Sequence, residues 1–445
     1  MSHRVVVIGG GFGGVQAVSA LRDAPVQVTL IDKRNFHLFQ PLTYQVATGA
    51  LSSADVAYPL RAIFKSAPNV SVMLAEVAGF DLDAREVHLR PARGVRSTPT
   101  TMPYDTLIVA AGSSYSYFGH EDWREFAYEV KTLESAVAVR SKILRAFERA
   151  EMESDPDERV AEMTFVIVGG GPTGVEMAGQ IGELARDTLQ RDFRVIDPRR
   201  TRVVLVDALD RILQTFPKSL SAKATRSLER LGVTTMTNQT VVGVDADSVT
   251  MRDPDGNTQR IATKTAIWAA GVTASGLGSH LAELAGAEVD KAGRVTVQPD
   301  LTLAGHPEVI VLGDMVRVRD HDGNPVTLPG VAPAAIQQGH YAGKLVRDRL
   351  AGRSTRPFRY RDKGNVATIG RGRAVVDLRF LRLSGLPAWM VWLVVHVWYL
   401  IGFQNRIVVI IRWSFSFFTH GRSARLIEEL TTPPPDAEPP QQGSQ

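Results

Sequence analysis

The fold is decided by residues 4–32, RVVVIGGGFGGVQAVSALRDAPVQVTLID. Four apolar residues, 5–8, run straight into a glycine cluster, as a short buried strand does. An alanine-rich segment of helical character follows over residues 15–21, and a second apolar strand covers residues 26–31. This strand–turn–helix–strand order predicts an α/β unit that opens on a glycine-rich turn.

The glycine cluster has the spacing G-x-G-x-x-G at Gly9, Gly11 and Gly14, and the second strand ends at Asp32. In such a loop the first glycine allows the tight turn. The second lets backbone approach a pyrophosphate, and the third lets the helix pack close to the strand. The helix N-terminus offers free N–H groups to phosphates, and Asp32 can accept a hydrogen bond from a ribose hydroxyl. Together these features predict a dinucleotide site.

The same arrangement recurs in the middle of the chain. An apolar run over residues 165–168 leads into a glycine loop, a helical segment over 175–184 and a strand over 203–206 that ends at Asp207. The glycines of this loop are Gly169, Gly171 and Gly174. The polar stretch 186–200 is either a helix extension or an insertion. Two such units predict two dinucleotides, with electrons passing between them.

Composition sets the outer limits. A chain of 445 residues is too long for one core and suggests two or three domains. Its 51 basic and 47 acidic residues give no electrostatic case for a nucleic-acid partner. It contains no cysteine, so thiol redox chemistry and cysteine metal ligands are excluded, and no metal site is predicted. The first strand begins at once, so we expect no signal peptide and a cytoplasmic folded body.

Further elements follow the two glycine loops. Residues 70–112 have the pattern of short strands, and residues 130–150 that of a helix. The acidic stretch 151–159 is predicted to be a solvated linker into the second loop. Residues 221–231 are expected to be helical and residues 233–251 to form strands.

Several strand ends carry small or acidic residues. The run IVAAG, residues 108–112, ends in a turn at Gly112 that lets backbone approach a cofactor, and IWAAG at 267–271 repeats it. Residues 309–314 form a strand that closes on Gly313 and Asp314. An acid there can bind a ribose or polyol, or it can cap a helix. The apolar connection 35–49 is long enough to line a site.

This combination resembles the flavoproteins that have two dinucleotide-binding domains. The resemblance implies that the first loop and the late Gly-Asp bind FAD and that the second loop binds NADH. The FAD residues would be Gly9, Gly11, Gly14, Asp32, Gly112, Gly313 and Asp314. The NADH residues would be Gly169, Gly171, Gly174 and Asp207. Glu176 matches a catalytic glutamate near the flavin ring and nicotinamide; otherwise it is a polar residue on an exposed helical turn.

Three longer stretches resemble type II NADH:quinone oxidoreductases. They are FQPLTYQVATG (39–49), DKGNVATIGRGRAVVDL (362–378) and HVWYLIGFQNR (396–406), and the resemblance runs from residue 5 to about 427. It implies hydride transfer from NADH to FAD, then two electrons to a membrane quinone, without proton pumping. It also implies a peripheral enzyme on the cytoplasmic face of the cell membrane, with a homodimer as a further expectation. The absence of cysteine agrees, because many relatives in this superfamily need redox cysteines.

The quinone site of this family has the motif A-Q-x-x-x-Q-x-G, which residues 329–343 match in part. Gln337 and Gly339 fit the motif, but Pro333 stands where the first glutamine is expected. Either Gln337 recognises the quinone with other groups, or the acceptor differs from the usual one. The residues that the resemblance assigns to the quinone are Ala332, Gln337 and Gln338.

The C-terminal region is apolar and rich in tryptophan. Residues 386–403 just reach the length of a spanning helix, but their aromatic residues are scattered instead of gathered at the two ends. Residues 404–418 mix basic and aromatic residues, which favours helices that lie on the lipid surface. We expect a membrane anchor that is separable from a complete two-domain fold, followed by a disordered tail over 431–445.

The predicted fold class is therefore α/β, with two Rossmann-like domains and a C-terminal amphipathic anchor. The expected boundaries are 1–115 and 301–383 for the two parts of the FAD domain, 116–300 for the NADH domain, 384–430 for the anchor and 431–445 for the tail. Two alternatives stay open. A soluble ferredoxin or rubredoxin reductase shares both glycine loops but needs no tryptophan-rich C-terminus. A flavin-binding redox sensor would bind flavin without turnover.

Overall fold

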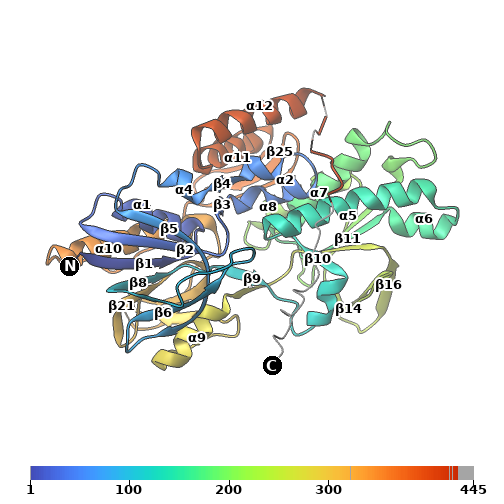
Figure 1. Ribbon diagram of the computed structural model, residues 1–445. Helices are drawn as coiled ribbons and strands as arrows, with labels where there is room; N and C mark the ends of the chain where they lie inside the picture. The colour runs from blue at the N-terminus through green and yellow to red at the C-terminus, as the bar shows by residue number, and fades with distance from the viewer. Residues whose placement is uncertain (1, 321, 420, 423, 429–445) are drawn as a thin grey trace, which may run out of the picture.

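The computed structural model describes residues 2–320, 322–419, 421–422 and 424–428. Its larger sheet has eight strands and holds the first glycine loop (Figure 1). The strands, in sheet order, are β20 (Thr302–Leu303), β21 (His306–Val311), β8 (Thr106–Val109), β1 (His3–Ile8), β2 (Val26–Asp32), β5 (Val70–Asp81), β6 (Glu86–Pro91) and β7 (Thr101–Pro103). The central strands β21, β8, β1, β2 and β5 are parallel, so their carboxyl ends share one edge. This sheet joins strands from before residue 110 to strands from after residue 301.

Two helices, α1 (Phe12–Leu21) and α10 (Ala332–Leu350), pack closely beside this sheet. The contact depends on small residues. A Cβ built on Gly339 would lie 2.1 Å from the carbonyl oxygen of Gly13, and one on Gly343 would lie 2.5 Å from the Cβ of Ala20. These glycines let the two helix backbones approach each other. Helix packing is therefore sufficient to explain why residue 339 is a glycine.

The second sheet has five parallel strands and holds the second glycine loop. In sheet order they are β10 (Ala127–Glu129), β17 (Thr265–Trp268), β11 (Thr164–Val168), β12 (Arg202–Val206) and β13 (Val233–Met236). Helices α5 (Leu133–Met152), α7 (Pro172–Glu183) and α8 (Lys218–Arg230) contribute to the core on one side. The meander β14 (Thr240–Val244), β15 (Ser248–Arg252) and β16 (Thr258–Ala262) packs with Trp268 in a separate core. The repeated runs IVAAG and IWAAG end equivalent strands, β8 and β17, each beside the strand that precedes a glycine loop.

Short elements join the two sheets. Strands β9 (Ser113–Tyr115) and β18 (Val272–Ala274) form an antiparallel pair between them. Helix α2 (Thr43–Ala47), from the long apolar connection, packs on α5 and α7 of the second half. The remaining connections contain β3 (Phe36–Leu38), α3 (Ser53–Val56), β4 (Ala57–Pro59), α4 (Leu60–Ile63), α9 (Gly276–Ala285), β19 (Val295–Val297), β22 (Val316–Arg319) and β23 (Pro325–Thr327).

The C-terminal region is part of the core, which the sequence analysis did not predict. Strands β24 (Asn365–Gly370), β25 (Arg373–Asp377) and β26 (Arg382–Gly385) form a small sheet on which α11 (Leu386–Tyr399) packs. In Figure 1, α11 lies beside α12 (Phe403–Thr419) at the top of the molecule. Ala388 and Trp392 are buried in the same hydrophobic cluster as α5 and α7. The expectation of a separable anchor is therefore wrong: one face of these helices completes the core.

The structure also decides three local expectations: the linker differs, the helix-extension alternative for 186–200 holds as far as Thr188, and the stretch 386–403 is divided. The predicted linker 151–159 is mostly helical, because α5 extends to Met152 and α6 (Pro156–Glu162) starts at an Asp155 cap. The stretch 186–200 holds a π-helical extension of α7, Leu184–Thr188, and a 3-10 turn, Pro198–Arg200. The apolar stretch 386–403 is not one helix, since α11 ends at Tyr399 and Gly402 has a φ of +88°. Within the described residues, no helix combines the length and the apolar character needed to cross a bilayer. The predicted tail 431–445 lies outside the described residues.

Candidate active site

The two glycine loops have nearly the same geometry. Gly9 and Gly169 adopt φ values of +97° and +109°, in the left-handed region that favours glycine. A Cβ on Gly14 would lie 1.8 Å from the carbonyl oxygen of Gly9, and Gly174 stands in the same relation to Gly169. The third glycine of each loop is thus required by the turn itself.

The second position of each loop is occupied by glycine for a different reason. A Cβ on Gly11 or on Gly171 would meet no atom within 4 Å, so protein packing does not demand glycine there. Both residues are N-caps, of α1 and α7, and neither helix has a side-chain cap. The open space and the free N–H groups fit a bound pyrophosphate, which needs close backbone approach at a helix N-terminus.

The two strand-end acids support these loops. Asp32 Oδ2 accepts a 2.6 Å hydrogen bond from the Gly10 amide, and Oδ1 accepts one of 2.7 Å from the Arg34 amide. Asp207 repeats the pattern, with hydrogen bonds from the amides of Gly170 and Leu209. Burial raises the pKa of Asp32, and the hydrogen bonds from the Gly10 and Arg34 amides oppose that rise. Each carboxylate keeps further lone pairs, so capping the loop is compatible with binding a ribose.

Asp314 lies at the carboxyl edge of the larger sheet. Its Oδ2 accepts a 2.6 Å hydrogen bond from Ser113 Oγ, and the same oxygen lies 3.9 Å from Lys131 Nζ. Gly112 and Gly313 both have positive φ, and a Cβ on either would face open space. The sequence analysis missed Lys131, because nothing in its local pattern separates it from an ordinary lysine.

Glu176 is buried in α7, which contradicts the alternative of an exposed helical turn. Its Oε1 accepts a 3.4 Å hydrogen bond from the Thr368 amide of β24. Burial raises the pKa of Glu176 well above its ordinary value, and the Thr368 hydrogen bond lowers it by less. The packing is close here, because a Cβ on Gly179 would lie 1.8 Å from the carbonyl oxygen of Ile369. The structure thus holds a carboxyl group whose burial favours the protonated form.

The segment with the quinone motif starts α10. Gln337 bonds through both atoms of its amide to Arg361: Nε2 donates to the carbonyl oxygen at 2.9 Å, and Oε1 accepts from the amide at 3.0 Å. Gln338 is buried, and its Oε1 accepts a 2.7 Å hydrogen bond from the Gly313 amide. In the described part of the chain, Gln338 Nε2 has no hydrogen-bond partner. Of the two glutamines, Gln338 therefore has the free donor, and it lies beside Asp314.

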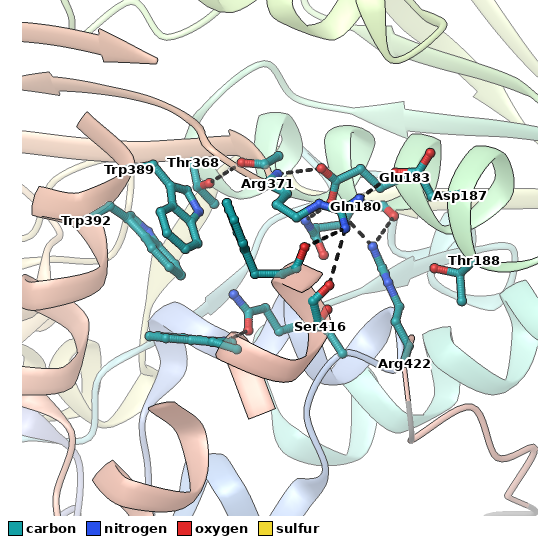
Figure 2. A pocket seen from close by; sticks show the side chains of 15 residues that line it. Gln180, Glu183, Asp187, Thr188, Thr368, Arg371, Trp389, Trp392, Ser416 and Arg422 are labelled. Carbon is teal, nitrogen blue, oxygen red and sulfur yellow. Dashed lines mark hydrogen bonds and ion pairs between the residues drawn. The ribbon is translucent and has the colours of Figure 1, made fainter. Parts of the chain in front are cut away.

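A cavity separates the C-terminal helices from α7 and β24 (Figure 2). Its walls include Trp389, Trp392 and Trp413 on one side and Gln180, Glu183 and Arg422 on the other. Figure 2 shows the polar groups joined to one another, and Arg371 donates to Asp187 Oδ2 at 2.7 Å. No local pattern indicated this polar cluster, because it joins residues almost 240 positions apart.

Comparison with known proteins agrees with this geometry. Residues 3–339 match the family model described as pyridine nucleotide-disulphide oxidoreductase, and the chain belongs to that family. Within it, the chain belongs to the type II NADH:quinone oxidoreductases. It is 45% identical to the type II NADH:quinone oxidoreductase NdhA of Mycobacterium tuberculosis over 96% of this chain and 89% of the relative. The enzyme named Ndh from the same organism is 43% identical over 96% of this chain and 90% of its own length.

Solved structures share the fold. The structure of NDH2 from Plasmodium falciparum has a TM-score of 0.86 at 19% identity and covers 96% of this chain and 100% of that chain. The sulfide:quinone oxidoreductase of Aquifex aeolicus has a TM-score of 0.70 at 16% identity, with 94% and 95% covered. The resemblance to this family and the predicted fold class are therefore confirmed.

Proposed function

We propose that this chain is a membrane-associated enzyme that transfers a hydride from NADH to FAD and then two electrons to a quinone, without proton pumping. The observation that carries this proposal is the pair of matched glycine loops. Each lies at the carboxyl ends of parallel strands in its own sheet, in a chain without cysteine. Two dinucleotides can bind in one molecule, and no thiol pair stands between them and the acceptor.

FAD would be held by the first loop and by the edge that Asp314 occupies. The amides at the N-terminus of α1 would take the pyrophosphate, and Asp32 and Asp314 would accept from hydroxyl groups. Gly112 and Gly313 leave open backbone where a large ring system can approach. When bound, the flavin supplies the redox chemistry, and the protein orients it and controls its surroundings.

NADH would be held by the second loop in the same way. The amides of α7 would bind its pyrophosphate, and Asp207 would accept from the ribose and repel a 2′-phosphate, which favours NADH over NADPH. Glu176, one turn further along α7, would hold a proton near the nicotinamide because its burial favours the neutral form. Gly179 holds β24 against α7 and so keeps the Thr368 amide on this carboxyl group.

For the quinone we propose the segment with Ala332, Gln337 and Gln338. Gln338 supports this proposal best, through its buried Nε2 beside Gly313 and Asp314. Gln337 would contribute only if its two hydrogen bonds to the Arg361 backbone open. Pro333 cannot supply the amide that the family motif has at its position.

We also propose that the outer faces of α11 and α12 lie on a lipid bilayer, at its cytoplasmic face. Large apolar side chains are exposed on both helices, including Val394, Trp398, Ile411, Phe415 and Phe418. An exposed apolar surface of this kind marks an interaction site. A homodimer stays a proposal with no separate support in the chain.

The test is NADH oxidation by the holoenzyme on membranes, with added quinones or with a soluble protein acceptor. The proposal expects fast turnover with quinone and slow turnover with a ferredoxin or rubredoxin. The reverse preference would favour the reductase alternative. Bound flavin with negligible turnover on every acceptor would favour a sensor.

A further inference from the structure

Three side chains connect the outer helix α12 to the short helix α2. Trp413 Nε1 donates a 2.7 Å hydrogen bond to Gln45 Oε1, and Gln45 Nε2 donates one of 3.1 Å to the Tyr44 hydroxyl oxygen. All three residues are buried, and Tyr44 is only 2% exposed. They bridge 368 positions of sequence, from the apolar connection to the C-terminal helix.

The chemistry of these groups fixes the direction of both hydrogen bonds. An indole N–H can only donate, so the atom of Gln45 that faces Trp413 must be the carbonyl oxygen. The amide NH₂ of Gln45 must then face Tyr44, and it occupies a lone pair of the phenol oxygen. The Tyr44 hydroxyl therefore keeps its own hydrogen for another acceptor.

No acceptor for that hydrogen exists in the described part of the chain: the hydroxyl makes only the hydrogen bond from Gln45. A buried donor without an acceptor is costly, so such a group points to a ligand atom that accepts it. Burial raises the pKa of Tyr44 well above its ordinary value, and the hydrogen bond from Gln45 lowers it by less. Glu183 and Arg422 act on it more weakly, in opposite directions. The hydroxyl thus remains a donor at every working pH.

Tyr44 lies where a ring ligand is expected. Its helix packs on α7, which carries Glu176, and the neighbouring Gln45 lines the cavity of Figure 2. Flavin and quinone share one suitable acceptor, a carbonyl oxygen on a flat ring.

We propose that Tyr44 donates a hydrogen bond to a ring carbonyl oxygen in the site and that Trp413 is a positioning residue that fixes this donor through Gln45. The inference rests on the proposed function. It makes the outer helix α12, which we place on the membrane, part of the active-site wall as well.

The experiment uses the full-length holoenzyme and four variants. Tyr44→Phe removes the donor. Gln45→Glu keeps the size and the acceptor for Trp413, but its carboxylate would take the hydrogen of Tyr44. Trp413→Phe releases Gln45. Trp268→Phe is the matched control, because Trp268 is a buried tryptophan whose Nε1 donates a 2.9 Å hydrogen bond to the Ser116 carbonyl oxygen in a separate core, outside the lining of the cavity in Figure 2.

Two readouts separate the two ligands. If flavin is the acceptor, the first three variants shift the absorption spectrum and midpoint potential of the oxidised holoenzyme with no quinone present. If quinone is the acceptor, the flavin spectrum stays unchanged and the KM for a soluble quinone rises about five- to tenfold, the worth of one such hydrogen bond. In both cases the control Trp268→Phe has no effect, and Trp413→Phe adds nothing to Tyr44→Phe.

The proposal is overturned if folded Tyr44→Phe changes neither readout. The positioning role is overturned if Trp268→Phe matches Trp413→Phe, or if Trp413→Phe has its full effect on top of Tyr44→Phe. Should Trp413→Phe fail to fold, Gln45→Glu and Tyr44→Phe carry the test, and they must agree. A wild-type protein that does not reduce quinone would refute the proposed function, while the flavin readout would still decide the role of Tyr44.

Discussion

Arg422 and Glu183 form a buried ion pair, with Nη2 and Oε2 3.6 Å apart. Arg422 follows α12, whereas Glu183 ends α7, the helix of the second glycine loop. Arg422 also donates to the carbonyl oxygens of Thr48, at 3.0 Å, and Gln180, at 3.2 Å. Burial lowers the pKa of Arg422 to about 10, still far above neutral pH. The side chain of Arg422 thus connects the segment after α12 to both halves of the molecule.

Arg422→Ala should destabilise the fold by about 3 to 5 kcal/mol, because it leaves Glu183 buried without its partner. Arg425→Ala is the matched control. Arg425 pairs with Asp192 at the surface, so its loss should cost about 1 kcal/mol or less. Urea unfolding of the two variants measures the difference. Equal small losses would show that the C-terminal segment is only loosely attached.

Asp314→Ala should release FAD on gel filtration, because the variant loses the carboxylate that Ser113 and Lys131 hold at the sheet edge. The control is Asp320→Ala, which changes an aspartate that accepts hydrogen bonds from the turn amides of Asp322 and Asn324. The flavin-to-protein absorbance ratio before and after filtration reports the outcome. Full flavin retention by Asp314→Ala would remove this residue from the FAD site.

Glu176 should make stability fall as pH rises. Burial raises its pKa above the ordinary 4.5, so the folded protein keeps a proton that the unfolded chain loses. The stability contribution is present below about pH 4.5 and is lost as pH climbs to the raised folded pKa. Glu176→Gln should remove this loss, so that the stability of the variant relative to wild type increases with pH.

The control for this pH effect is Glu151→Gln, in α5. Hydrogen bonds from the amides of Ile196, Arg194 and Val195 lower the pKa of Glu151, so its substitution should have the opposite sign. Melting temperatures between about pH 3 and 8 test both, because Glu151 changes stability below about pH 4.5 and Glu176 above it. A Glu176→Gln curve parallel to wild type would mean that Glu176 is ionised in the fold.

Replacing Trp398, Phe415 and Phe418 together by serine should release the enzyme from lipid. These side chains are 74%, 63% and 78% exposed. Burying each of them in a bilayer would contribute about 1.5 to 3 kcal/mol of binding free energy. Co-sedimentation with phosphatidylcholine vesicles should weaken at least tenfold, while NADH-dependent reduction of a soluble dye persists. Met152→Ser, at an 85% exposed residue of α5, should bind vesicles like wild type. Unchanged vesicle binding by the triple variant would place the lipid contact elsewhere.

Local pattern was enough to predict the glycine loops, because the first and third glycines of each loop answer a local steric need and the second leaves open backbone for a phosphate. The strands before and after each loop also followed from short apolar runs. The same reasoning explains two errors. The acidic stretch near residue 155 looked solvated, yet an Asp–Pro start made it a helix. The apolar C-terminus was expected to be separable from the fold, yet composition cannot tell a membrane-facing side from a core-facing one.

The part of the site that depends on long-range contact could not be predicted. The motif predicted that the Gln337 amide is available for a quinone, but both of its polar atoms form hydrogen bonds to the Arg361 backbone. Tyr44 and Gln45 belong to the connection 35–49, for which the sequence predicted only that it lines a site. Their partner, Trp413, comes from the other end of the chain. Such pairings appear only when the chain has folded.

The most direct test of the central claim is stopped-flow absorbance of the purified holoenzyme in two mixing steps. NADH without oxygen or quinone should bleach the flavin band in one fast phase, and a soluble quinone should then restore it within the turnover time. Bleaching without recovery on quinone would contradict the proposed acceptor. A flavin band that NADH does not bleach would contradict the account as a whole.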